Sequence, residues 1–153
     1  MIMNHEKRIL IVDDDTQVLS GFKQTLELEG YLVDTAETGK EAIEKSNRNT
    51  YNLALIDIRL PDMAGTKLLT ELHESVPKMR KIMVTGYPSQ NNAIEAVNKA
   101  ADAYLIKPIL DMNTLHNTIK EQLQKQDEER QYSEEKVAEF IRSGVKKEET
   151  KQE

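Results

Sequence analysis

Four short apolar runs, each followed at once by a polar residue, most constrain what this chain can fold into. The runs are residues 9–12, 53–56, 81–84 and 103–106, and a weaker fifth run covers residues 31–33. The four clear runs are continuous and rich in β-branched residues or leucine, which is typical of strands buried on both faces. Apolar residues at helical spacing fill the intervals. Strand therefore alternates with helix, and this predicts an α/β fold with a doubly wound parallel sheet of five strands.

The helical intervals carry start and stop signals of their own. Thr38 and Glu41 have the spacing of a capping box, Gly30 stands where the first helix would end, and Asp111 is suited to begin the last helix. The expected helical stripes fall within residues 18–26, 42–43, 68–72, 93–101 and 115–123. These signals predict one helix after each strand.

The polar residues that end the four clear runs are suited to phosphoryl chemistry. They are Asp13, Asp14 and Asp15 after the first run, Asp57 after the second, Thr85 after the third and Lys107 after the fourth. Ligands of open parallel sheets bind at the carboxyl ends of the strands. We therefore expect a carboxylate cluster, a hydroxyl and a lysine to share one crevice.

The three adjacent aspartates predict a divalent metal site. Gathered carboxylates repel one another unless a cation neutralises them, and oxygen ligands without histidine or cysteine favour Mg²⁺. These acids also suit the N-terminus of the first helix, but one cap is enough and Asp15 or Thr16 can supply it. Asp13 and Asp14 are then left for the metal. No G-x-G-x-x-G follows the first strand, which argues against a dinucleotide site.

Asp57 taken alone could start a turn or pair with a lysine. Beside the acid cluster, a metal-assisted aspartyl nucleophile is the better interpretation. Pro61 and Gly65 would shape the loop that follows, leaving the carboxylate exposed at the rim. Lys107 would pair with Asp57 at rest and with a phosphoryl oxygen after transfer, and Pro108 would allow a cis peptide that aims the lysine inward.

The composition excludes several other classes. The 153 residues suit one domain with a small appendage, and the net charge of −6 with a pI of about 5.2 disfavours direct nucleic-acid binding. There is no cysteine, and therefore no disulfide or thiolate chemistry. No signal peptide and no run of about 20 apolar residues is present, so no membrane insertion is predicted and the expected location is cytoplasmic.

The motifs resemble those of the receiver domains of two-component response regulators, including the single-domain chemotaxis regulators. The resemblance covers residues 7–124 and consists of I-V-D-D at 11–14, D-x-x-L-P-D-M-x-G at 57–65, V-T-G at 84–86 and K-P at 107–108. It implies a flavodoxin-like (βα)5 fold with strand order 2-1-3-4-5. It also implies that Asp57 accepts a phosphoryl group from the phosphohistidine of a sensor kinase or phosphotransfer protein.

The resemblance also assigns roles to the surrounding residues. Asp13, Asp14 and Asp57, with the backbone carbonyl of Arg59, would arrange Mg²⁺. Lys107 would clamp the phosphoryl group, and Thr85 with Tyr104 would form a switch pair. The face built by the fourth helix, fifth strand and fifth helix would then bind a downstream protein.

Residues 126–153 differ from the expected receiver domain at 1–125. Residues 127–153 hold nine acids and six bases, and their only apolar grouping is Val137, Phe140, Ile141 and Val145. We expect a charged extension that is helical or partly disordered. A docking or dimerising helix, or a connector to an output module, is the alternative, and a homodimer is left open.

Three functions remain to be compared. The first is a phosphorylation-dependent switch that catalyses only its own phosphoryl transfer and autodephosphorylation. The second is a phosphatase of the haloacid-dehalogenase kind, which requires a second acid at the position that Arg59 occupies. The third is a scaffold that keeps the fold alone. A receiver fragment of a longer multidomain regulator would have the same sequence features as the first.

Overall fold

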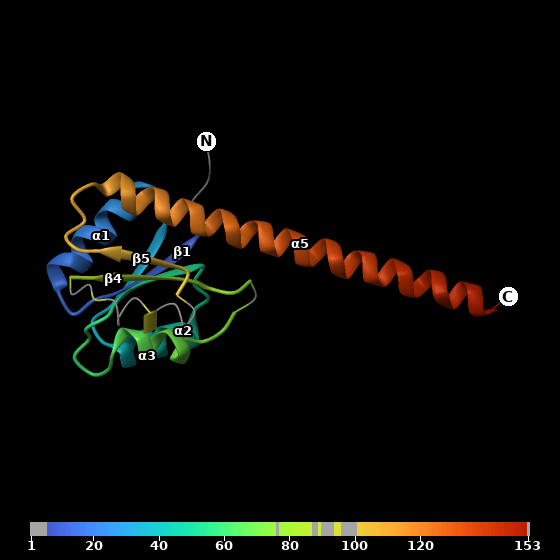
Figure 1. Ribbon diagram of the computed structural model, residues 1–153, viewed down its shortest axis with the longest axis horizontal. Helices are drawn as coiled ribbons and strands as arrows, with labels where there is room; N and C mark the ends of the chain where they lie inside the picture. The colour runs from blue at the N-terminus through green and yellow to red at the C-terminus, as the bar shows by residue number, and fades with distance from the viewer. Residues whose placement is uncertain (1–5, 76, 87–88, 90–93, 96–100, 153) are drawn as a thin grey trace.

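The computed structural model describes residues 6–75, 77–86, 89, 94–95 and 101–152, and its centre is a five-stranded parallel sheet (Figure 1). The strands are β1 (Arg8–Val12), β2 (Leu32–Ala36), β3 (Leu53–Asp57), β4 (Arg80–Thr85) and β5 (Ala103–Ile106). Their order is β2-β1-β3-β4-β5, and every pairing is parallel. The predicted α/β fold, strand number and strand order are confirmed.

Both faces of the sheet are buried, as the continuous apolar runs predict. Successive side chains of a strand point to opposite faces. In β1, Leu10 and Val12 join one hydrophobic cluster while Ile9 and Ile11 join the other. β3 is buried along its whole length. The first cluster takes its helical residues from α2 and α3, and the second takes them from α1 and α5, which lie on the opposite side of the sheet (Figure 1).

Four described helices surround the sheet. They are α1 (Thr16–Leu28), α2 (Gly39–Arg48), α3 (Gly65–Glu71) and α5 (Met112–Gln152). The side chain of Thr38 caps α2 by accepting from the backbone N–H of Glu41, and Gly30 follows α1 with a φ of 94°. Asp111 accepts from the N–H of Asn113 at 2.9 Å, at the start of α5. The helix ends predicted from Gly30, Thr38 and Asp111 are therefore confirmed.

The predicted fourth helix falls mostly outside the described residues. Of the stripe expected within 93–101, Ile94 is helical together with Glu95, and Ala101 lies in no helix but packs against the first cluster. Ala93 and Val97 lie outside the described residues.

Helix α5 continues without a break from the sheet into the predicted extension. Leu115, Ile119 and Leu123 are buried against the sheet, whereas residues 128–144 are all exposed. The carboxamide of Gln126 donates to the backbone oxygens of Asn52 and Lys78 at 2.9 and 2.8 Å, so polar contacts with the sheet continue past residue 125. None of the helices in the described ranges combines the length and apolar character that crossing a membrane requires.

We predict that Gly65→Ala destabilises the protein by about 2 kcal/mol, as overpacked sites do. A Cβ at Gly65 would lie 2.1 Å from the backbone oxygen of Asp57, where no flexible side chain can move aside. Gly21→Ala is the matched control, because a Cβ there meets nothing within 4 Å and alanine favours a helix by about 1 kcal/mol. Urea unfolding measures both changes. Equal stability of the two variants would contradict the prediction.

Candidate functional site

The carboxyl ends of β1 and β3 bring three aspartates together. Asp13, Asp14 and Asp57 each offer a carboxylate oxygen, and these oxygens all lie within 4.8 Å of one another. The cause is topological, because β1 and β3 are adjacent and pair Val12 with Ile56, the residues just before the acids. Asp13 and Asp57 are buried, whereas Asp14 is exposed. The expectation that the loop after Asp57 leaves its carboxylate exposed is therefore wrong, because neighbouring strands and Lys107 cover it.

The three N-terminal aspartates have different contacts. Asp15 caps α1, since its carboxylate accepts from the N–H groups of Gln17 and Val18 at 2.9 and 3.3 Å. Asp13 accepts from the N–H of Asp15 at 2.9 Å, which turns its carboxylate toward the crevice. Asp13 and Asp14 are thus left free of the helix cap, as the sequence suggested.

Lys107 reaches both buried carboxylates from the end of β5. Its Nζ lies 2.5 Å from Oδ2 of Asp13 and 3.1 Å from Oδ2 of Asp57. Because β4 lies between β5 and β3, only a long side chain can span this distance. Its backbone N–H donates to the oxygen of Thr85 at 2.7 Å, and the Lys107–Pro108 peptide is cis. The lysine pairs with Asp57 at rest, as predicted from the sequence.

Burial and pairing shift the ionisation of this pair. Burial raises the pKa of the Asp57 carboxyl above its usual range, and the nearby Asp13 charge adds to this, while Lys107 opposes both. Burial alone would lower the pKa of Lys107, but its hydrogen bonds to Asp13 and Asp57 outweigh burial and raise it. The ammonium therefore stays charged and offsets one of the two buried carboxylates.

Thr85 and Tyr104 lie on the same side of the sheet. Thr85 ends β4 and is fully buried, and Met83, two residues earlier, is in register with Tyr104 of β5. The ring of Tyr104 packs against the first hydrophobic cluster. Its hydroxyl is buried and has no hydrogen-bond partner within the described ranges. A tyrosine in this state has a polar group ready to accept a new partner.

The loop between β3 and α3 folds back tightly on the strand. The N–H of Gly65 donates to the oxygen of Ile58 at 2.6 Å, Arg59 and Ala64 form an antiparallel bridge, and Pro61 is exposed at the turn. This brings the start of α3 against the backbone of Asp57. Pro61 and Gly65 therefore lie where a loop-shaping role requires.

Sequence reasoning assigned no role to Asp62, although it stands within the central motif. Its two carboxylate oxygens accept from the N–H groups of Gly39 and Lys40, each at 2.9 Å, at the N-terminus of α2. These two hydrogen bonds lower the pKa of the Asp62 carboxyl. The partners lie 22 and 23 residues away in the chain, so no local spacing signals the contact.

The donor set of the crevice fits Mg²⁺. The three clustered ligands are all carboxylate oxygens, and hard oxygen ligands are those that Mg²⁺ prefers. Two buried carboxylates matched by one lysine also leave an excess of negative charge for a cation to offset. That the backbone carbonyl of Arg59 also coordinates the ion stays a prediction.

A groove of about 590 Å³ adjoins the crevice. It is lined by α1 residues, including Val18 and Phe22, and by Pro108, Ile109 and Met112 beyond β5, and Lys107 borders it. The crevice is therefore continuous with a partly apolar surface of α1.

Comparison with known proteins decides the family. The model of the response regulator receiver domain matches residues 9–120. This chain belongs to the response regulator receiver domain family. Two-component receiver domains are signalling switches rather than classical enzymes, and Mg²⁺ binding and phosphorylation are features of this family.

Relatives of this receiver domain include regulators and solved receiver structures. The alginate biosynthesis transcriptional regulatory protein AlgB of Pseudomonas syringae pv. tomato is 35% identical over 104 residues, which cover 68% of this chain and 23% of AlgB. A CheY-like receiver domain protein from Methanospirillum hungatei JF-1 is 51% identical, with a TM-score of 0.76, and the match covers 80% of this chain and 98% of that one. The response regulator TrrA of Thermotoga maritima, solved in complex with Mg²⁺-BeF, is 32% identical, with a TM-score of 0.68 and coverage of 76% and 98%. The receiver chain spans about a quarter of the length of the curated relatives it matches.

We predict that Lys107→Met lowers the free energy of unfolding by about 3 kcal/mol without Mg²⁺, because two buried carboxylates lose their counter-charge. The same change should tighten Mg²⁺ binding about tenfold or more, since a competing cation is removed. Titration calorimetry and urea unfolding measure the two effects. The control is Lys23→Met, which removes only an exposed pair with Glu27. Weaker Mg²⁺ binding by Lys107→Met would contradict this account.

We predict that Asp62→Asn makes the protein less stable at neutral pH and that the difference disappears in acid. The folded pKa of Asp62 lies below its unfolded value, so its contribution is fully present above the unfolded pKa, near 3.8. It is lost as the pH falls through the lower, folded pKa. Urea midpoints measured from neutral pH downward test this, and a difference that stays constant with pH would refute it.

Proposed function

We propose that Asp57 is the phosphoacceptor of this receiver domain. The observation that carries the proposal is the position of its carboxylate at the end of β3, among two other acids and 3.1 Å from the ammonium of Lys107. A carboxylate in this position can attack phosphorus while a cation balances the charge.

The transfer balances without any co-reactant beyond the donor. An oxygen of Asp57 forms the new bond to phosphorus, the bond between phosphorus and the donor nitrogen of a phosphohistidine breaks, and its electron pair stays with the imidazole. Asp13, Asp14 and Asp57, with the Arg59 carbonyl, would hold the ion. Bound Mg²⁺ supplies positive charge to offset the negative charge on the phosphoryl oxygens. Lys107 is placed to leave Asp57 and pair with one of those oxygens.

The switch would work through Thr85 and Tyr104. A phosphoryl group adds close to two negative charges and three acceptor oxygens at the rim. The Thr85 hydroxyl would turn toward these oxygens, and Tyr104 would fill the space it leaves. The ring already lies on that side of the sheet with an unsatisfied buried hydroxyl. The face that includes β5 and α5 would change shape as a result.

Partners are proposed from the surfaces next to these groups. The donor would be a sensor histidine kinase or a phosphotransfer protein, and the groove along α1 borders Lys107, where such a protein must approach Asp57. The output partner would bind the face of the fourth helix, β5 and α5, where Ile106 and Leu110 are exposed. Most of the fourth helix lies outside the described residues.

The remaining alternatives carry less support. A phosphatase of the haloacid-dehalogenase kind needs an acid two residues beyond the nucleophile, and Arg59 stands there. We therefore propose that catalysis is limited to the domain's own phosphoryl transfer and hydrolysis. Residues 1–125 are proposed as the receiver domain and 126–153 as an extension. A receiver that is part of a longer regulator has the same site, and this reading agrees with the length of the curated relatives.

We predict that acetyl phosphate with Mg²⁺ adds one phosphoryl group to the wild-type chain and none to Asp57→Asn. Intact-mass spectrometry measures the labelling, and omission of Mg²⁺ should reduce it strongly. Asp15→Asn is the matched control, because asparagine caps a helix as well as aspartate does and the residue lies next to the crevice. This variant should label like the wild type.

Two results would overturn the proposal. Undiminished labelling of Asp57→Asn would move the acceptor to another residue. Labelling that does not respond to Mg²⁺ would show that the metal takes no part in the transfer. Steady turnover of a generic phosphomonoester would instead favour the phosphatase.

A further inference from the structure

The distal half of α5 extends beyond the rest of the protein as an unsupported helix (Figure 1). Its last described contacts with the sheet are made by Gln126, which donates to the oxygen of Lys78, and by Glu129, which lies 2.5 Å from the guanidinium of Arg80. The helix continues to Gln152, more than twenty residues farther. At 1.5 Å per residue, the free part is roughly 35 Å long.

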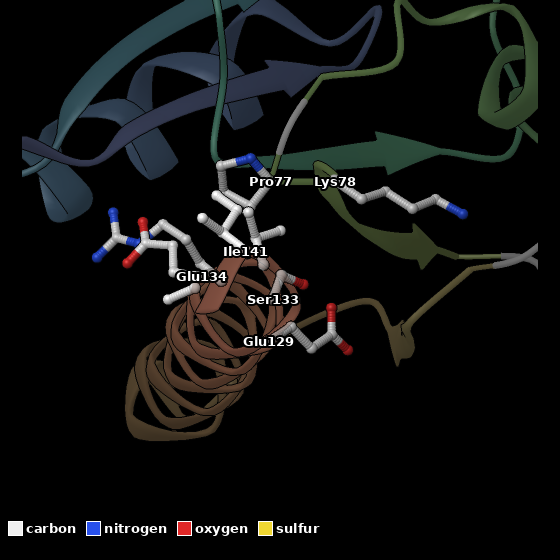
Figure 2. A pocket seen from close by; sticks show the side chains of 9 residues that line it. Pro77, Lys78, Glu129, Ser133, Glu134 and Ile141 are labelled. Carbon is white, nitrogen blue, oxygen red and sulfur yellow. The ribbon is translucent and has the colours of Figure 1, made fainter. Parts of the chain in front are cut away.

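This free part exposes an apolar stripe. Val137 and Ile141 are each 59% exposed and Phe140 is 80% exposed. Phe140 and Val137 continue the side of the helix that buries Leu115 and Ile119, because steps of three and four residues connect them. A groove of about 690 Å³ runs along this side between α5 and the segment of Pro77 and Lys78 (Figure 2). In Figure 2, Ile141 points toward the side on which that segment lies.

The helix has little internal support for staying folded in water. The described side-chain contacts within its free part are a Lys136 ammonium 5.6 Å from the centre of the Tyr132 ring, a hydrogen bond of 3.4 Å from Gln131 to Glu135 and a long ion pair of 3.8 Å between Arg130 and Asp127. Isolated helices gain most of their stability by packing an apolar face. The stripe therefore requires a partner surface to become stabilising.

The charge pattern of the extension indicates which partner fits. Residues 127–139 hold six acids and two bases, whereas residues 140–153 hold three acids and four bases. A parallel pair of such helices would lie acid against acid. An antiparallel pair would lay the acidic half of one copy along the basic half of the other. Val137 and Phe140 stand on either side of the boundary between these halves, so the apolar stripes would also meet.

We propose that two copies of this chain associate through antiparallel packing of their α5 extensions, about a two-fold axis near residues 138–139. The interface would use the same stripe of each copy, as two-fold symmetry requires. It would fill the groove beside Pro77 with the second helix. This association uses none of the residues of the phosphoryl site.

The proposed register makes a specific charge pairing. Position 130 (Arg) of one copy would lie opposite position 148 (Glu) of the other. Arg130 is half exposed, and its ion pair with Asp127 is long, at 3.8 Å, and lies within the same helix. Its charge is thus available to a second copy.

The first test is sedimentation velocity of the full chain over a concentration series. Wild type is expected to sediment as a dimer, and the double variant Phe140→Glu with Ile141→Glu as a monomer, with thermal unfolding of the receiver unchanged. Leu28→Glu is the matched control, because Leu28 is 82% exposed but lies on α1; it should stay dimeric. A monomeric wild type, or a dimer that survives the double variant, overturns the proposal.

A charge exchange tests the register. Arg130→Glu alone and Glu148→Arg alone should each weaken dimerisation about tenfold, because each reversal acts twice in a two-fold dimer. The combination of both changes in one chain should restore it. Loss without restoration in the combined variant overturns the proposed pairing.

Disulfide trapping tests the orientation, since the natural chain has no cysteine. Ser133 and Gly144 lie eleven residues apart, close to three full turns, and so share one face of the helix. Antiparallel packing predicts that a mixture of Ser133→Cys and Gly144→Cys forms the mixed disulfide on mild oxidation. Disulfides only between identical variants would show a parallel pair and refute the antiparallel arrangement.

Discussion

The ammonium of Lys107 between the carboxylates of Asp13 and Asp57 is the contact on which the carboxyl edge of the sheet depends. Two buried carboxylates side by side repel each other, and one cation offsets only part of their charge. The contact also joins strands that are not neighbours, because it spans from β5 across β4 to β3 and β1. A slip of one residue in any of these strands would turn its terminal side chain to the other face. Strand register and site electrostatics are therefore specified together.

Much of this arrangement could be predicted from the sequence, because it follows from local patterns. Continuous apolar runs identify the strands, and the rule that ligands bind at the carboxyl ends of parallel strands predicts that Asp57 lies near Asp13. The sequence left two candidates for the cap of α1, and the structure selects Asp15. The strand order came from the resemblance of the motifs to a family, since periodicity alone does not determine which strands are adjacent.

The rest could not be predicted, because it depends on contacts between residues far apart in the chain. Asp62 holds the N-terminus of α2 through two backbone N–H groups, and a turn aspartate gives no local sign of such a partner. Gln126 connects α5 with the backbone of Asn52 and Lys78, which lie just before the amino ends of β3 and β4. A glutamine in a highly charged segment looks like a solvated residue. Its burial follows only from the position of the helix over the sheet.

The unbroken course of α5 has a mechanical consequence. The helix begins five residues after Lys107 and continues to Gln152, so a single rod of about 60 Å connects the neighbourhood of the crevice with a distant tip. The helix leaves the sheet after Glu129, so only its free part of about 35 Å can tilt, and a tilt of about 5° over that length moves the tip by roughly 3 Å. Small repacking where the helix leaves the sheet thus becomes a displacement of about two residues' rise at the tip.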